Sequence, residues 1–128
     1  MTREVLSVRS DARLEELAAL FSRSGFDLLP VVAPGMLLQG VVTRTDLLAH
    51  LLSAPSPRAL AQRRGGPVTA LLRPVAPLLG ADRLAKAARR LSAEGLPALP
   101  VADGGGRLTG ILSRADLVRH AGALPVRI

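Results

Sequence analysis

The chain has 128 residues, of which 48% are hydrophobic and only 2% aromatic, and it contains no cysteine. This length allows a close-packed aliphatic core, and the lack of cysteine excludes disulfides and thiolate metal sites. The formal net charge of +7 comes almost wholly from arginine, since Lys86 is the only lysine. A basic chain favours polyanions or a phosphate-bearing ligand. Biased codon usage accounts for the arginines better, because they do not gather on one predicted face.

The chain begins with a predicted strand and helix. Val5–Val8 reads as a short strand. The helix is expected to begin at Ser10 or Asp11 and to end before Gly25, which supplies a left-handed terminus. Its buried stripe has the spacing i, i+3, i+4, i+7 and consists of Leu14, Leu17, Ala18 and Phe21.

A hairpin and a second helix follow. Leu28–Val32 and Leu37–Thr43 read as antiparallel strands around a turn at residues 33–35. Thr43 or Thr45 then begins a helix. The predicted apolar face of this helix consists of Leu47, Leu48, Leu51 and Leu52. Residues 1–52 therefore form a first lobe with the order strand, helix, strand, strand, helix.

Residues 53–67 read as a linker, because they hold three prolines and two glycines. We expect this linker to be irregular or mobile, with room for a short helix at Ala59–Arg64. Residues 68–128 form the second lobe, which ends in a tail at Gly122–Ile128 that the sequence does not assign. The elements expected in this lobe are a helical turn at Val68–Leu72, a strand at Val75–Leu78, a helix at Ala81–Glu94 with Leu84, Ala87, Ala88 and Leu91 inward, a hairpin of Ala98–Val101 and Leu108–Ser113 around Gly104–Gly106, and a helix at Arg114–His120.

The second lobe is a copy of the first. Residues 11–50 align without gaps with residues 81–120, and fifteen of these forty pairs are identical. Such self-similarity indicates an internal duplication. Two small lobes that each expose one apolar sheet face bury both most simply against each other, about an approximate two-fold axis. We therefore predict an α+β fold of two pseudo-two-fold-related β-α-β-β-α lobes packed sheet to sheet, with two equivalent clefts between them.

The repeated stretch resembles a known family. Leu29-Pro30-Val31-Val32 followed by Gly40-Val41-Val42-Thr43-Arg44-Thr45-Asp46-Leu47, and its copy from Leu99-Pro100-Val101 to Gly110-Ile111-Leu112-Ser113-Arg114-Ala115-Asp116-Leu117, look like the signature of CBS domains in tandem, a Bateman module. The resemblance covers roughly Val5–Leu52 and Val68–His120. It implies a regulatory module without chemistry of its own. Such modules bind AMP, ADP, ATP or S-adenosylmethionine in the clefts between the lobes and relay occupancy to a fused or associated transporter or enzyme.

The resemblance also implies which residues bind the ligand. The aspartate of the motif, Asp46 or Asp116, would hold the ribose hydroxyls, with Thr43 or Ser113 near the phosphates and Arg44 or Arg114 adding charge. The apolar strand residues that would flank the adenine are Leu29, Pro30, Val31, Leu99, Pro100 and Val101. A carboxylate accepts well from two vicinal hydroxyls, and a helix N-terminus favours phosphate.

The same spacing has a purely structural interpretation. Thr43-x-x-Asp46 and Ser113-x-x-Asp116 each satisfy a helix capping box, which needs no ligand. The two roles can coexist. A ligand-free dimerisation or interaction module therefore stays open as the alternative to a sensor.

Three departures from the family pattern affect these expectations. Pro77 replaces the equivalent of Ser7 and predicts an edge strand, because proline cannot donate to a ladder. Asp27 becomes Pro97, which predicts unequal affinity at the two sites. The helical turn that precedes the second copy is absent before the first, which favours a fragment or the regulatory part of a larger protein.

Other functions have weaker support. His50 and His120 lack a second ligand at helical spacing, and no nucleophile has a recognisable base, so we predict neither a metal site nor an enzyme and expect no cofactor. Nucleic-acid binding is supported only by charge and opposed by the scarcity of aromatic residues. No signal peptide or membrane span is predicted. We therefore expect a cytoplasmic protein, which self-associates as a homodimer through its leucine-rich final helices.

Overall fold

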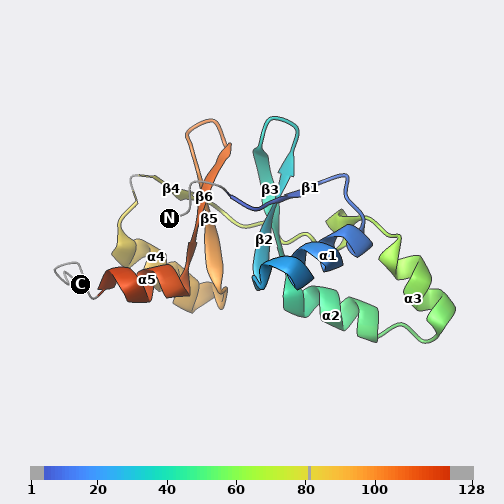
Figure 1. Ribbon diagram of the computed structural model, residues 1–128. Helices are drawn as coiled ribbons and strands as arrows, with labels where there is room; N and C mark the ends of the chain where they lie inside the picture. Colours follow the sequence, from blue (N-terminus) through green and yellow to red (C-terminus); the bar gives the residue numbers. More distant parts are fainter. Residues whose placement is uncertain (1–4, 81, 122–128) are drawn as a thin grey trace. The chain divides into compact units, whose positions relative to one another are not determined.

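The computed structural model describes residues 5–80 and 82–121, and the chain divides into two compact units (Figure 1). One unit is Leu6–Pro74, and the other contains the second repeat from Val75 onward. Each unit has its own three-stranded sheet. The predicted α+β class with two β-α-β-β-α repeats is therefore confirmed. The packing of one sheet against the other stays a prediction.

The first repeat has the predicted order of elements, in the sheet order β1-β2-β3. Strand β1 pairs in parallel with β2, and β2 pairs antiparallel with β3, with Val31 opposite Gly40. The bounds are β1 Val8–Arg9, α1 Leu14–Ser24, β2 Leu28–Ala33, β3 Leu37–Thr43 and α2 Arg44–Leu52. The prediction placed the first strand and the start of the first helix about three residues too early.

The second repeat has the same arrangement, with bounds that match those of the first to within one residue after a shift of seventy. These are β4 Leu78–Leu79, α4 Leu84–Glu94, β5 Ala98–Ala102, β6 Leu108–Ser113 and α5 Arg114–Ala121. Strand β4 lies at the sheet edge, as the proline at position 77 predicts. In the first repeat, Ser7 stands at the equivalent position and precedes β1, which is as short as β4. The proline is therefore not the reason for the short strand. The tail 122–128 lies outside the described residues.

The helix stripe of α1 builds the core of the first repeat. Leu14, Leu17 and Phe21 are buried, and Ala18 packs against them partly buried. Gly25 ends the helix at φ 70°, where its N–H donates to the carbonyl of Phe21 at 3.1 Å. This left-handed terminus confirms the prediction.

Two predicted apolar faces are only partly correct. On α2, Leu47 is buried, but Leu48 is 50% and Leu52 80% exposed. On α4, Ala87 and Leu91 are buried, whereas Ala88 faces solvent. The side chain of Leu84 lies outside the described residues. A two-layer repeat covers only one side of each helix, so the stripes are narrower than the sequence suggested.

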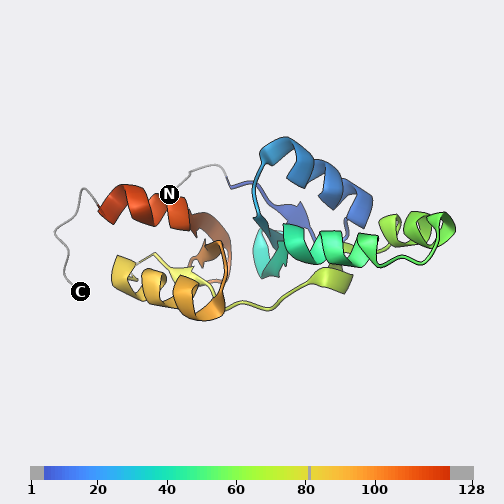
Figure 2. The same ribbon diagram turned by 90° about the horizontal axis from the view of Figure 1, so that it is seen from below.

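More than half of the predicted linker is helical, and this helix contains the stretch Ala59–Arg64 for which the sequence left room. Helix α3 spans Pro57–Arg64, with Ser56 as its N-cap and a proline in its first turn (Figure 2). Proline suits this position because its missing N–H has no partner there anyway. Arg63 Nη1 donates to the carbonyl of His50 at 2.6 Å and to Ser53 Oγ at 2.7 Å, which ties α3 to the end of α2.

The segment after α3 completes the core of the first repeat. The 3-10 turn η1, Val68–Leu71, inserts the fully buried Val68 into the core around α1. The N–H of Leu14 donates to the carbonyl of Gly66 at 2.9 Å, so the linker satisfies an amide at the start of α1. The sequence analysis grouped this turn with the second repeat, whereas the compact unit extends to Pro74.

We predict that Leu17→Ala lowers the free energy of unfolding by about 2–5 kcal/mol, because it opens a cavity in a closed aliphatic core. Urea unfolding followed by circular dichroism measures this loss. The matched control is Leu37→Ala on the 41%-exposed position of β3, which should cost less than about 1 kcal/mol. Equal losses at the two positions would contradict the assigned core.

Candidate functional site

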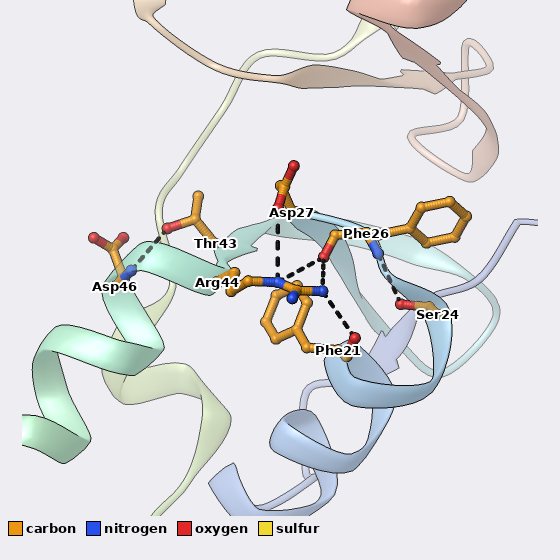
Figure 3. Close-up of polar contacts among 7 residues, drawn as sticks. All are labelled: Phe21, Ser24, Phe26, Asp27, Thr43, Arg44 and Asp46. Carbon is orange, nitrogen blue, oxygen red and sulfur yellow. Dashed lines mark hydrogen bonds and ion pairs between the residues drawn. The ribbon is translucent and has the colours of Figure 1, made fainter.

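The first candidate site lies where β3 passes into α2. Thr43 ends the strand with extended dihedral angles and caps the helix, its Oγ1 accepting from the N–H of Asp46 at 3.1 Å. Figure 3 shows this contact and the separate direction taken by the side chain of Arg44. The threonine is buried, whereas the aspartate carboxylate stays partly accessible. The strand end and the cap together fix the start of α2 and the position of Asp46.

The carboxylate of Asp46 forms a bidentate ion pair with Arg73. The guanidinium Nε lies 2.5 Å from Oδ2 and Nη2 lies 2.7 Å from Oδ1. The Arg73 bond holds the pKa of the Asp46 carboxyl below its usual range, although partial burial opposes this effect. The same pair raises the pKa of Arg73.

The backbone of Arg73 is fixed to strand β3. Its N–H donates to the carbonyl of Val41 at 2.8 Å, and its carbonyl accepts from the N–H of Val41 at 2.9 Å. Position 40 must be glycine here, because a Cβ would lie 2.4 Å from the carbonyl oxygen of Arg73. This close approach brings the guanidinium within reach of α2.

The second candidate site, where β6 passes into α5, uses the same residue types differently. Ser113 Oγ accepts from the N–H of Asp116 at 3.1 Å and donates to Oδ2 of its carboxylate at 3.0 Å. The N–H of Ser113 donates to the same Oδ2 at 3.0 Å. Arg119, one turn further along α5, pairs with Oδ1. Burial raises the pKa of the Asp116 carboxyl, but the bonds from Ser113 outweigh it and leave this pKa below its usual range.

The capping-box interpretation therefore fits the two sites to different degrees. Ser113 and Asp116 form the complete reciprocal box. Thr43 supplies its half of the box, whereas the carboxylate of Asp46 turns to Arg73. The sequence shows the same spacing twice and does not reveal this difference.

The side chain of Arg44 is directed toward the end of α1. Its Nη2 donates to the carbonyls of Phe21 at 2.9 Å and Phe26 at 2.7 Å, and its guanidinium lies 5.7 Å from the Phe21 ring centroid (Figure 3). Asp27 adds an ion pair at 3.6 Å. Arg44 thus fastens α1 to α2, whereas the family resemblance implied that it adds charge at the ligand site. Arg114 is exposed, and its N–H donates to the carbonyl of Pro97 at 3.0 Å.

The strand residues predicted to flank an adenine are all buried. Leu29 and Val31 belong to the core cluster of the first repeat, on the helix-covered face of its sheet. Successive strand residues point to opposite faces, so Pro30 lies on the other face. Their counterparts Leu99, Pro100 and Val101 are also buried and follow the same alternation on β5.

Sequence analysis missed Arg73. The residue lies twenty-seven positions after Asp46, in a segment that was assigned to the second repeat. Only the docking of this segment on β3 brings the two side chains together. The sequence shows a charged residue before Pro74 in a strand-like segment. Its spacing from other residues does not indicate which carboxylate it pairs with.

Metal and membrane interpretations gain no support from the part of the chain that the structure describes. No three histidine, aspartate or glutamate side chains among the described residues are grouped as a metal site would need. His50 lies in the last turn of α2, and the side chain of His120 is outside the described residues. None of the described helices has the length and apolar character needed to cross a membrane.

Comparison with known proteins identifies the family. The sequence model of the CBS domain matches residues 1–53 and 70–123, so the chain belongs to the CBS domain family as a tandem pair. The crystal structure of CBSX2 in complex with AMP has 30% identity and a TM-score of 0.79, covering 93% of this chain and 88% of that one. Another structure of CBSX2, from Arabidopsis thaliana, has 29% identity and a TM-score of 0.81, with 93% and 86% covered.

Two curated relatives are considerably longer than this chain. MJ1225 of Methanocaldococcus jannaschii is 29% identical over an alignment of 128 residues in length. This alignment covers 94% of this chain and 45% of that protein. Its crystal structure gives a TM-score of 0.82 at 28% identity, with the same coverage. YtoI of Bacillus subtilis is 30% identical over 96 residues, 75% of this chain and 19% of that protein. The chain thus spans less than half the length of these two relatives.

We predict that acid destabilises the protein through its paired carboxylates. Asp46, Asp82 and Asp116 have pKa values below their usual range in the folded state. Their stabilisation is present above the unfolded value of about 3.9 and is lost as pH falls through the lower folded values. The free energy of unfolding should therefore fall below about pH 5. Urea unfolding at a series of pH values measures this slope.

Asp46→Asn tests the contribution of one pair, because an amide does not titrate. This variant should have a shallower acid slope than the wild type. Arg73→Ala should remove the same part of the slope, since Arg73 is the main cause of the lowered Asp46 pKa. An unchanged slope in both variants would show that the pair has no effect on stability.

Proposed function

We propose that this chain is a non-catalytic regulatory module that binds an adenosine-containing ligand and relays its occupancy to a fused or associated protein. The ligand classes proposed are AMP, ADP, ATP and S-adenosylmethionine. The observation that carries the proposal is the paired arrangement of Thr43 with Asp46 and Ser113 with Asp116, each at the start of a helix. The AMP complex of CBSX2, a relative that matches nearly the whole chain, supports the ligand class.

The chemistry of both junctions suits a nucleotide. Each provides a carboxylate that can accept hydrogen bonds from vicinal ribose hydroxyls. Both junctions also lie at a helix N-terminus, where the positive end of the helix dipole favours a phosphate. Thr43 adds a hydroxyl donor at the first junction, whereas the hydroxyl of Ser113 already donates to Asp116.

The proposal needs fewer residues than the sequence suggested. Leu29 and Val31 are buried beneath α1, and Pro30 on the other face of the sheet is fully buried as well, so none of the three side chains offers an exposed contact to a ligand. Arg44 serves the α1–α2 connection, and exposed Arg114 remains a candidate for the second site. Asp46, Asp116, Thr43 and Ser113 form the proposed polar set.

A ligand-free dimerisation module is the second candidate. Exposed apolar side chains on α2 and α5 favour it: Leu48 and Leu52 on the first helix, and Val118, the counterpart of Leu48, which is 75% exposed. Exposed apolar side chains that form a contiguous patch are typical of a protein–protein interface, and a second copy of the chain would cover the same patch on both partners. Nucleic-acid binding has only the net charge in its favour.

We predict that Asp46→Ala and Asp116→Ala each weaken AMP binding by about 1.5–3 kcal/mol, because each removes charge-assisted hydrogen bonds to the ribose. Isothermal titration calorimetry measures the affinities. Asn should be milder than Ala at either position, since its amide oxygen still accepts one bond. Thermal melts of the same variants report the cost to the folded state.

The structural alternative predicts the opposite pattern. If the aspartates only stabilise their helices, the melting temperature falls and any affinity for AMP stays unchanged. Asp103→Ala, in the exposed hairpin turn of the second repeat, is the control for loss of one carboxylate. Loss of stability without loss of binding at both sites would leave the dimerisation module as the better interpretation.

We predict a homodimer, with about twice the 13.4 kDa mass of the chain in light scattering at micromolar concentration. Leu52→Asp should shift the protein toward the monomer, because a carboxylate would be buried at an apolar interface. Met36→Asp, at a 41%-exposed residue of the first hairpin turn, is the control and should leave the mass unchanged. A wild-type monomer at all concentrations would refute the dimer.

A further inference from the structure

The ion pair between Asp46 and Arg73 occupies the atoms that the proposed ligand needs. Both carboxylate oxygens of Asp46 accept from the guanidinium, at 2.5 and 2.7 Å. A ribose that bonds to the same two oxygens in the same direction has to displace Arg73. Binding at the first site is therefore an exchange of partners, and this inference rests on the function proposed above.

The geometry lets the side chain of Arg73 move while its backbone stays in place. The two backbone bonds to Val41 hold its main chain against β3. Its side chain is 52% exposed, whereas that of Asp46 is 25% exposed. Rotation about the outer bonds of Arg73 therefore frees the carboxylate and disturbs no core residue.

The exchange favours a ligand that offers something to each partner. A neutral nucleoside gives hydroxyls to Asp46 but leaves Arg73 without its anion. A nucleoside phosphate gives hydroxyls to Asp46 and an anion to the released guanidinium, near the positive end of the α2 dipole. We propose that Arg73 is a specificity-determining residue, which makes the first site selective for nucleoside phosphates over neutral or cationic adenosine derivatives.

The second site is built differently. Asp116 Oδ2 is bonded to Ser113 within its own capping box, and Oδ1 pairs with Arg119 from the same helix. The counterpart of Arg119 in the first repeat is Ala49. The first site therefore draws its guanidinium from a separate, docked segment, and we assign the phosphate selectivity to that site.

Calorimetric titration of the full chain with AMP, adenosine and S-adenosylmethionine tests this assignment. The wild type should bind AMP at least about tenfold more tightly than the other two ligands. Arg73→Ala should weaken AMP binding by about tenfold and strengthen adenosine binding by about two- to fivefold, because an exposed ion pair contributes little to stability and its loss frees Asp46. A binding heat that is present in the wild type and absent in Asp46→Ala is assigned to the first site.

Two further variants make the result specific. Arg9→Ala removes one arginine from an exposed pair with Asp11 and should leave every affinity unchanged. Arg73→Gln removes the charge but retains a shorter polar side chain with an amide donor, so it replaces Arg73→Ala if the latter melts early. The Gln variant should also lose the preference for AMP.

The outcomes separate this inference from the function on which it rests. Absence of binding by every ligand, in wild type and variants alike, would overturn both. Asp46-dependent AMP binding with an unchanged AMP-to-adenosine ratio in Arg73→Ala would overturn only the role of Arg73. A parallel loss of AMP and adenosine binding would likewise overturn it, since a purely structural role weakens both ligands equally.

Discussion

Both repeats depend on one local constraint, the hydroxyl that ends a strand and caps the next helix. Thr43 and Ser113 each accept from the amide of the aspartate three residues later, at 3.1 Å. The amides of Arg44 and Arg114 donate to the chain that enters the preceding hairpin, at Asp27 and Pro97. These bonds fix the end of the strand to the start of the helix, so the carboxylates of Asp46 and Asp116 are positioned by the same contacts that form the fold.

The two aspartates occupy the same position of a repeated motif, but their electrostatic surroundings differ. Asp46 faces a guanidinium delivered by another segment, whereas Asp116 is held by Ser113 and by a neighbour on its own helix. The two aspartates also differ in burial, because Asp116 is buried whereas Asp46 is partly accessible. A duplicated motif therefore need not give duplicated chemistry. Whatever binds at these positions encounters two sites that differ in charge and accessibility.

The sequence predicted the order of elements well, because the stripe of α1 and the hairpin glycines reflect local periodicity and backbone geometry. It overestimated the buried faces, as Leu48, Leu52 and Ala88 show, since hydrophobicity alone does not reveal which side of a helix is covered. It left room for a short helix at Ala59–Arg64 but did not predict that Ser56 and Pro57 begin this helix two residues earlier. The sequence did not predict the partners of Asp46 and Arg44, because each contact joins two segments that are far apart in the chain and follow no regular spacing.

The burial of Val68 has a consequence for how the chain reaches its native state. A nascent chain that ends at Leu52 already contains every strand and helix of the first repeat, yet lacks the valine that completes its core. The carbonyl that satisfies the amide of Leu14 is missing as well. Closure of the first repeat during synthesis must therefore wait for the segment that ends at Pro74. A fragment designed to hold the first repeat alone has to extend that far.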